Sequence, residues 1–245
     1  MDYAHHGRRN WAAVCYTGCE SGSHFFTMRV EKLADNGGDF KERIAEAVKI
    51  LLGGGIVAFP TDTVYGLGAC YYLERAVERI YAVKKRPSGM ALPLLLSGSD
   101  QVREVADSVP PVAHLLIEKF FPGALTLILN KRSTVPSFVT GGGNTVAVRV
   151  PKHPVPVALA LGVGAPISGT SANLSGRSSL LTAEEVRDEL GYRVDMIIDA
   201  GICTGGRDST VVDVTGDRPA VIREGAIDYA TLKEVCGDIT LKREV

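Results

Sequence analysis

The stretch IVAFPTDTVYGLGA, residues 56–69, decides the fold class of this 245-residue chain. Its first four residues, Ile56–Phe59, are all apolar, and a short continuous apolar run predicts a strand that is buried on both faces. Polar residues follow at once, at Thr61, Asp62 and Thr63. Proteins with alternating helices and strands place ligands beyond the carboxyl ends of their strands, so we expect this turn to line a site.

Helices and strands alternate on both sides of this stretch, which predicts an α/β fold with short connections. No internal repeat or linker divides the chain, so we expect one domain over 28–245, preceded by a poorly ordered extension over 1–27. The predicted helices cover 40–52, 73–86, 102–109, 111–121, 154–164 and 182–191, and the predicted strands cover 28–33, 56–59, 91–98, 124–130, 145–151, 166–173, 195–201, 209–216 and 220–227.

The composition is that of a globular protein, with 45% hydrophobic and 22% charged residues. A net charge of −1 and a pI near 6.5 argue against a surface that binds nucleic acid over its whole extent. No apolar run approaches the roughly 20 residues that span a bilayer, and the N-terminus has no signal-peptide apolar region. We therefore expect a cytoplasmic protein with no membrane partner.

The five cysteines are an odd number with irregular spacing, which favours reduced thiols over a disulfide framework. Cys15 and Cys19 could in principle ligate zinc together with His5, His6 and His24. Their spacing matches no common zinc motif, so we predict no resident metal site.

Common catalytic signatures are missing. The chain has no G-x-x-x-x-G-K-[ST] loop and no G-x-G-x-x-G after a strand. GTSAN, residues 169–173, comes within one residue of the nucleophile elbow G-x-S-x-G, but Asn173 replaces the last glycine. No sequence argument places His114 or His153 beside Ser171. The sequence therefore disfavours P-loop, Rossmann and serine-hydrolase chemistry.

Polar residues gather instead at the ends of predicted strands, in segments 61–65, 145–149, 168–173 and 209–210. Hydroxyls, amides and backbone N–H groups bind phosphate oxygens and small zwitterions without a covalent nucleophile. Three consecutive cations, 84–86, end a predicted helix; cations also favour a helix C-terminus through its dipole. Together these features favour an anionic substrate.

Six separate stretches carry a family resemblance: FPTDTVYGLGA (59–69), KKRP (84–87), PGALTLIL (122–129), VAVRVPKHP (146–154), SGTSANLSG (168–176) and VIREGAI (221–227). In order and spacing they resemble the YrdC domain of threonylcarbamoyl-AMP synthases, over roughly 30–227. The resemblance implies an α+β fold with an open, twisted, mixed β-sheet flanked by helices and a concave substrate cleft. It also implies an enzyme that makes threonylcarbamoyl-AMP and pyrophosphate from L-threonine, bicarbonate and ATP, with Mg²⁺, for the t6A37 modification of tRNA.

The family's K-x-R and S-x-N motifs fall on Lys84, Arg86, Ser171 and Asn173, which the resemblance marks as the catalytic positions. It implies that the cations neutralise the triphosphate and that Arg149 pairs with the carboxylate of threonine. Positioning, rather than an acid–base pair, would then dominate catalysis. The implied nucleotide contacts are Lys84, Arg86, Ser88, Thr145, Ser171, Ser179 and Arg223, and the implied threonine contacts are Thr61, Arg149, Gly169 and Ser209.

Simpler structural explanations compete with a functional one at several positions. Lys85 reads as a solvated helix-end charge, because the motif skips it. Asp62 could cap a turn, Tyr65 could pack in the core with a satisfied hydroxyl, and His153 reads as structural. Arg223, near the C-terminus, could be an ordinary surface residue.

Two departures from the family pattern matter. Met90 stands where the family often has a lysine, which puts one phosphate contact in doubt. The chain also ends soon after Arg223, so it resembles the short form of the family, without a further C-terminal domain.

Two other functions stay open. One is a double-stranded RNA-binding module with a basic concavity, which would show steep salt dependence. The other is a carbamoyl-adenylate-forming domain, as in hydrogenase maturation proteins, although the acylphosphatase and zinc-finger regions of those proteins are not seen. The sequence indicates neither the oligomeric state nor the partners that would transfer the threonylcarbamoyl group to tRNA.

Overall fold

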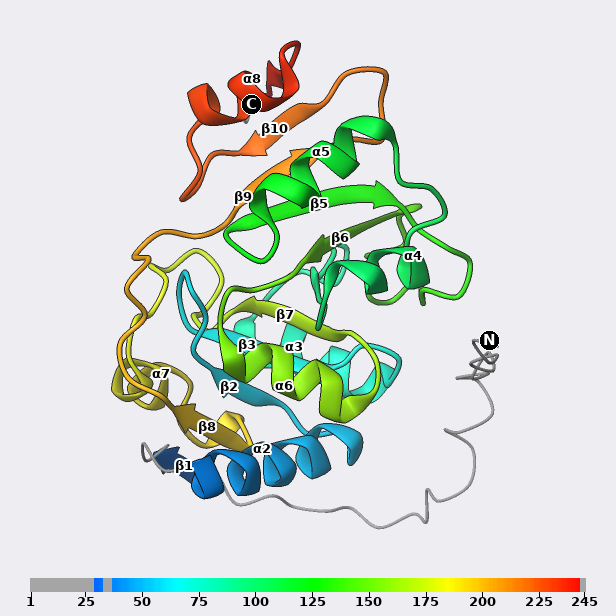
Figure 1. Cartoon of the computed structure of the whole chain (residues 1–245). Helices are drawn as coiled ribbons and strands as arrows, with labels where there is room; N and C mark the ends of the chain where they lie inside the picture. The colour runs from blue at the N-terminus through cyan, green and yellow to red at the C-terminus, as the bar shows by residue number, and fades with distance from the viewer. Residues whose placement is uncertain (1–28, 33–36, 243–245) are drawn as a thin grey trace, which may run out of the picture.

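A computed structural model describes residues 29–32 and 37–242 of the chain. In this part, eleven strands form one mixed sheet in the order β1-β8-β2-β3-β7-β4-β6-β5-β9-β10-β11 (Figure 1). The strands are β1 (Arg29–Lys32), β2 (Val57–Phe59), β3 (Gly66–Cys70), β4 (Leu94–Leu95), β5 (Leu125–Asn130), β6 (Thr145–Arg149), β7 (Ile167–Ser171), β8 (Met196–Asp199), β9 (Thr210–Asp213), β10 (Ala220–Arg223) and β11 (Thr240–Leu241). The α-helices are α2 (Gly37–Leu52), α3 (Glu74–Lys84), α4 (Val102–Val105), α5 (Pro111–Phe120), α6 (Pro154–Val163), α7 (Ala183–Leu190) and α8 (Tyr229–Cys236).

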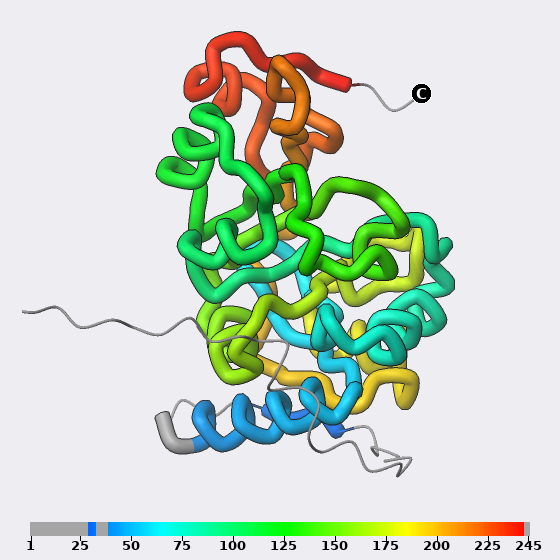
Figure 2. The backbone as a smooth tube through the Cα atoms, turned by 90° about the vertical axis from the view of Figure 1, so that its right-hand side faces the viewer, coloured from blue at the N-terminus to red at the C-terminus, as the bar shows by residue number. Residues whose placement is uncertain are grey.

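The sheet mixes parallel and antiparallel pairs, as predicted. Strand β8 pairs in parallel with both β1 and β2, whereas β3 pairs antiparallel with both β2 and β7. The sheet runs from β1 and β8 at one end of the molecule to β10 at the other, and the view turned by 90° keeps α2 and the C-terminal elements at opposite ends (Figure 2). The cysteines and histidines considered as zinc ligands, and the predicted extension over 1–27, lie outside the described residues.

Helices cover the two faces of the sheet around β2, β3 and β7. Helices α2 and α6 pack against one face, where Leu51, Phe59 and Leu159 belong to one apolar cluster. Helix α3 packs against the other face, where Ile80 and Leu67 belong to a second cluster. Figure 1 shows α6 in front of β7 and α3 behind it. Each fully buried side chain of this size contributes about 1.5–3 kcal/mol.

Local signals place the helix ends. Thr182 accepts a hydrogen bond from the Glu185 N–H at 3.2 Å, and the Glu185 carboxylate accepts one from the Thr182 N–H at 3.1 Å. This is the predicted capping box, and it starts α7. His153 begins α6, where its Nδ1 accepts a hydrogen bond from the Val155 N–H at 3.3 Å. The structural interpretation of His153 is therefore confirmed.

The structure corrects several predicted elements. Strand β3, helix α8 and strand β11 were not predicted, and the predicted helix over 102–109 and strand over 91–98 shrink to α4 and β4. The predicted strands over 145–151 and 166–173 are confirmed as β6 and β7, but the polar residues of 145–149 and 168–171 lie within these strands and not at their ends. Strand β3 contains Gly66 and Gly68, which suggest a turn. A Cβ atom there would lie 2.9 and 2.8 Å from the ring of Phe59, so the glycines let that ring lie on the sheet.

Candidate active site

One face of strands β5, β6 and β9 is left open by the packing. Thr145, Ala147 and Arg149 share this face because side chains alternate along β6. Strand register places Ile128 of β5 opposite Ala147, and Asp213 of β9 opposite Ile128. All of these except Arg149 are only partly buried, whereas the valines of β6, on the other face, are in the core. We call this surface the open face.

Lys84 joins the end of α3 to the loop after β7. Its side chain is buried, and its Nζ donates hydrogen bonds to the carbonyl oxygens of Ser171 and Asn173, the second at 2.5 Å. The Ser175 N–H donates to the Lys84 carbonyl oxygen at 2.9 Å. Burial, and to a smaller extent the charge of Arg86, lower the pKa of Lys84 to about 8. The structure thus brings the K-x-R and S-x-N motifs together through Lys84.

The next two cations differ from Lys84 and from each other. Lys85 has a left-handed backbone, with φ of 51°, and its side chain is exposed, which agrees with its interpretation as a solvated charge. Arg86 is half-buried and donates from Nη2 to the Ala91 carbonyl oxygen at 3.0 Å. Its Nε is buried without a hydrogen-bond partner among the described residues. The covered Nε is not exposed to a ligand, so what Arg86 presents at the surface is the charge of its guanidinium.

Arg149 forms a buried ion pair with Asp62. Its Nη2 lies 2.7 Å from Asp62 Oδ1, its Nη1 donates to Thr63 Oγ1 at 3.0 Å, and its Nε donates to the Gly123 carbonyl oxygen at 2.9 Å. Burial lowers the pKa of Arg149, and the charge of Asp62 opposes that effect. Asp62 also accepts the Lys152 N–H at 3.0 Å, so it does more than cap a turn.

Two of the implied threonine contacts are engaged in the fold itself. The Thr61 hydroxyl donates to the Val64 carbonyl oxygen at 2.7 Å and accepts the Thr63 N–H at 3.1 Å, so it shapes the turn that carries Asp62. Gly169 is buried within β7. A Cβ atom at Gly169 would lie 2.5 Å from Leu95, so this position admits only glycine unless Leu95 moves.

Ser179, Ser209 and Arg223 meet around Asp208, a residue that the sequence analysis missed. Asp208 Oδ1 accepts a hydrogen bond from Ser179 Oγ at 2.8 Å, and its Oδ2 lies 3.6 Å from Arg223 Nη1. Arg223 Nη2 donates to the Ser209 carbonyl oxygen at 2.9 Å. The Ser209 and Thr126 hydroxyls are 2.9 Å apart. Arg223 is therefore part of a cluster rather than a lone surface residue.

The remaining side chains lie apart from these three groups. Ser88 is exposed and lines a pocket of about 290 Å³ with Tyr81 and Phe138. Tyr65 is buried, and its hydroxyl donates to the Gly201 carbonyl oxygen at 3.0 Å. Burial raises the pKa of the Tyr65 hydroxyl, in agreement with a role in the core.

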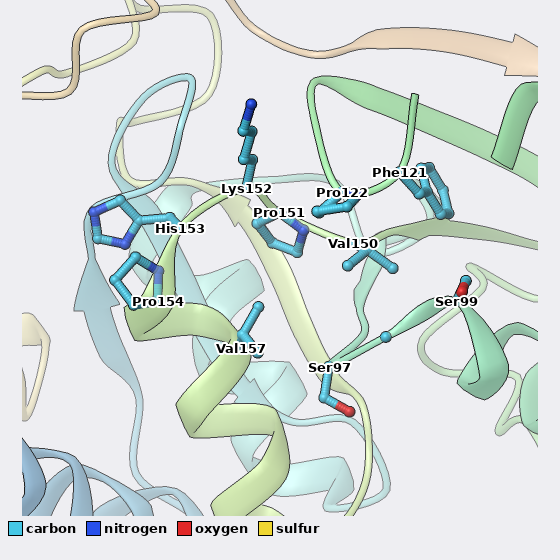
Figure 3. A pocket seen from close by; sticks show the side chains of 11 residues that line it. Ser97, Ser99, Phe121, Pro122, Val150, Pro151, Lys152, His153, Pro154 and Val157 are labelled. Carbon is cyan, nitrogen blue, oxygen red and sulfur yellow. The ribbon is translucent and has the colours of Figure 1, made fainter. Parts of the chain in front are cut away.

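A second pocket, of about 530 Å³, lies beside this region (Figure 3). Its walls include Val150, Pro151, Pro154 and Val157, and none of the implied site residues lines it. Lys152 belongs to its rim, and the backbone N–H of this residue bonds to Asp62. The implied residues therefore lie outside this pocket.

Two kinds of feature are missing from the described ranges, 29–32 and 37–242. These ranges contain no group of three or more His, Cys, Asp or Glu side chains that could hold a metal ion. No helix among them is long and apolar enough to cross a membrane.

Residues 49–225 match the family model of Sua5, YciO and YrdC proteins, which is described as "Telomere recombination". The chain belongs to this family. It is 39% identical over 206 residues to the threonylcarbamoyl-AMP synthase of Pyrococcus abyssi, and 41% identical over 198 residues to that of Bacillus subtilis. These alignments cover 82% and 80% of this chain, but only 61% and 57% of the two relatives. The chain thus spans about three fifths of their length.

Solved structures of the family have the same fold. The structure of P. abyssi Sua5 in complex with L-threonine has a TM-score of 0.82 and 35% identity, covering 88% of this chain and 62% of that one. Escherichia coli YciO has a TM-score of 0.75 and 31% identity, covering 84% of this chain and 98% of that one. The expected YrdC-like sheet is therefore confirmed.

Proposed function

We propose that this chain is a threonylcarbamoyl-AMP synthase, which forms threonylcarbamoyl-AMP from L-threonine, bicarbonate and ATP. The observation that carries this proposal is the set of bonds from Lys84 Nζ to the carbonyl oxygens of Ser171 and Asn173. These bonds join both family motifs beside Arg86. The names of the relatives and the L-threonine bound to P. abyssi Sua5 support the same activity.

The end of α3 is suited to bind the triphosphate. Lys84 and Arg86 donate only to carbonyl oxygens in the described part of the chain, so their positive charge is not neutralised by a carboxylate partner. Lys84 holds the Ser171–Asn173 segment in place, and the half-buried Arg86 offers the positive charge of its guanidinium to a phosphate oxygen. Arg223 and Ser179, which lie beside Asp208, add further donors. Ser88 and Thr145 complete the proposed nucleotide contacts.

The Arg149 corner is suited to bind threonine. The Arg149–Asp62 pair is neutral overall, which matches a zwitterion better than a polyanion. A carboxylate would approach the guanidinium, and an ammonium would approach Asp62. Thr61, Gly169 and Ser209 lie in the implied threonine set, and the first two act by shaping the turn and the floor of the site.

The reaction then needs two bond-forming steps. The threonine ammonium first loses a proton to water, the free amine attacks the carbon of bicarbonate, and loss of water leaves a carbamate. A carbamate oxygen attacks the α-phosphorus of ATP while the bond to the β-phosphate oxygen breaks, and pyrophosphate leaves. The chain's cations reduce the repulsion between the two anions and hold them in line, so positioning accounts for catalysis.

Mg²⁺ would enter with the nucleotide. It prefers phosphate oxygens and water to an all-protein cage, which fits the lack of an acidic cluster among the described residues. When bound, it would neutralise charge that develops on pyrophosphate. We further propose that the product passes to a transferase acting on tRNA, in the cytoplasm, and that any RNA contact is secondary.

A pyrophosphate-release assay tests this function. The purified chain is incubated with ATP, Mg²⁺ and bicarbonate, with threonine, with carbamoyl phosphate or with neither, and the adenylate is identified by mass spectrometry. We expect turnover only with threonine. Arg86→Ala should reduce it far more than the neighbouring control Lys85→Ala. Turnover with carbamoyl phosphate alone would contradict the proposal.

A further inference from the structure

Asp208 occupies donors that the proposed function assigns to phosphate. Its two carboxylate oxygens take the Ser179 hydroxyl at 2.8 Å and the Arg223 guanidinium at 3.6 Å. Both residues belong to the implied nucleotide set. A carboxylate in this place therefore competes with a phosphate group for the same two partners.

The backbone fixes Asp208 in this position. The Ala226 N–H donates to the Asp208 carbonyl oxygen at 2.9 Å, and a Cβ atom at Gly225 would collide with the same oxygen. The side chain stays about one-third exposed. The charge of Asp208 also raises the pKa of Lys84 and of Arg149 against the effect of burial, so its field reaches both ends of the site.

We propose that Asp208 is a built-in substitute for phosphate, whose carboxylate holds Ser179 and Arg223 in the free enzyme and must release them when a polyphosphate binds. This inference rests on the proposed function. Like charges near one set of donors repel, so Asp208 weakens the binding of ATP and pyrophosphate and hastens the departure of the product. A carboxylate that only positioned Arg223 would have the opposite effect and would strengthen binding.

Calorimetric titration of the full chain with inorganic pyrophosphate, and separately with ATP, tests the sign of the effect. Asp208→Asn keeps an oxygen acceptor for Ser179 and removes the charge. We expect it to bind pyrophosphate about threefold to tenfold more tightly at low salt. This is the change in affinity expected when one repulsive charge is removed from a partly exposed site. The difference should shrink at high salt, because ions screen exposed charges. A purely structural change would not depend on salt in this way.

Two variants control for charge and for shape. Asp208→Glu keeps the charge and should bind like the wild type. Asp238→Asn makes the same change in net charge and breaks an exposed ion pair of 3.1 Å with Arg218, so it should leave binding unchanged. If Asp208→Asn does not fold, Asp208→Ser gives the same comparison.

Equal or weaker binding of pyrophosphate by Asp208→Asn would overturn the inference. The proposed function fails separately: a chain that forms no adenylate, yet binds pyrophosphate more tightly after Asp208→Asn, would keep the inference and lose the activity. If neither protein bound pyrophosphate or ATP, both would be overturned.

Discussion

Two groups of cations in the candidate site are held differently. At the end of α3, Lys84 and Arg86 donate to backbone carbonyl oxygens, and in the described residues neither forms an ion pair with a carboxylate. Beside β6, Arg149 is paired with Asp62 at 2.7 Å. The first group keeps net positive charge, and the second group is close to neutral.

This difference separates two binding tasks. A triphosphate needs uncompensated cations, because its own charge must be offset when water is removed. A free amino acid carries one charge of each sign and needs one partner of each sign. We therefore propose that the α3 end binds ATP and that the Arg149 corner binds threonine, and the following predictions test that proposal.

The largest effect should come from Lys84→Met. Two carbonyl oxygens lose their donor, and the Ser171–Asn173 segment is no longer held. We expect adenylate formation to fall about 100-fold or more, as when a preorganised donor is removed, and stability to fall by about 1–3 kcal/mol. Pyrophosphate release and urea denaturation measure these effects. The matched change Lys85→Met should alter neither, and equal losses in both variants would refute the distinction between these lysines.

Asp62→Ala should be the most destabilising change in the Arg149 corner. It leaves the Arg149 guanidinium buried without its counter-charge, which costs about 3–5 kcal/mol. Urea denaturation measures this loss, and Asp238→Asn, at an exposed pair, should cost less than about 1 kcal/mol. At permissive temperature the KM for threonine should rise more than the KM for ATP. The reverse order would contradict the assignment of the two groups.

Arg86→Gln should have a smaller and more selective effect. It removes the positive charge of the guanidinium but leaves the Lys84 bonds intact. We expect the KM for ATP to rise about tenfold, while the KM for threonine changes by less than about twofold. Steady-state kinetics with each substrate varied in turn gives both KM values. An equal rise in the KM for ATP and the KM for threonine would contradict the assignment of the two substrates to separate groups of cations.

The pH dependence should give the smallest effect, and its sign differs between activity and stability. Because burial lowers the pKa of Lys84 to about 8, its positive charge is lost as pH rises through 8 in the folded protein. The kcat/KM for ATP should therefore fall above pH 8. In the unfolded chain the lysine stays protonated to about pH 10, so the free energy of unfolding should rise between pH 8 and 10.

Lys84→Met checks this assignment. Both pH dependences should disappear in the variant when its residual activity and its unfolding are followed over the same range. If they persist, another group titrates there.

Local patterns in the sequence predicted the elements that depend on local chemistry. The apolar run at 56–59 became β2, and the Thr182 and Glu185 pair became a capping box. Strand β3 was missed because Gly66 and Gly68 suggest a turn. Their actual role is to leave room for the ring of Phe59, which precedes them in the chain. Helix α8 did leave a signal: Asp228 caps it by accepting the Thr231 N–H at 2.7 Å.

For the candidate site, too, the sequence predicted only part of the arrangement. The motif pattern identified Lys84, Ser171 and Asn173, which the structure joins directly. It gave no role to Asp208 and only a turn cap to Asp62. Asp62 acts through Arg149, 87 positions along the chain, and such pairings come from the tertiary fold rather than from spacing.

The left-handed residue at the end of α3 bears on the proposal that the K-x-R residues, Lys84 and Arg86, serve one ligand. An α-helix turns by about 100° per residue, so positions two apart project about 200° around its axis, toward nearly opposite sides. At Lys85 the backbone leaves the helix with φ of 51°. The directions of the Lys84 and Arg86 side chains are therefore not fixed by the 100° rotation per residue of the helix. Of the three cations, Lys85 is the one that is exposed to water. If α3 continued for one more turn with the same sequence, the side chains of Lys84 and Arg86 would point toward nearly opposite sides of the helix.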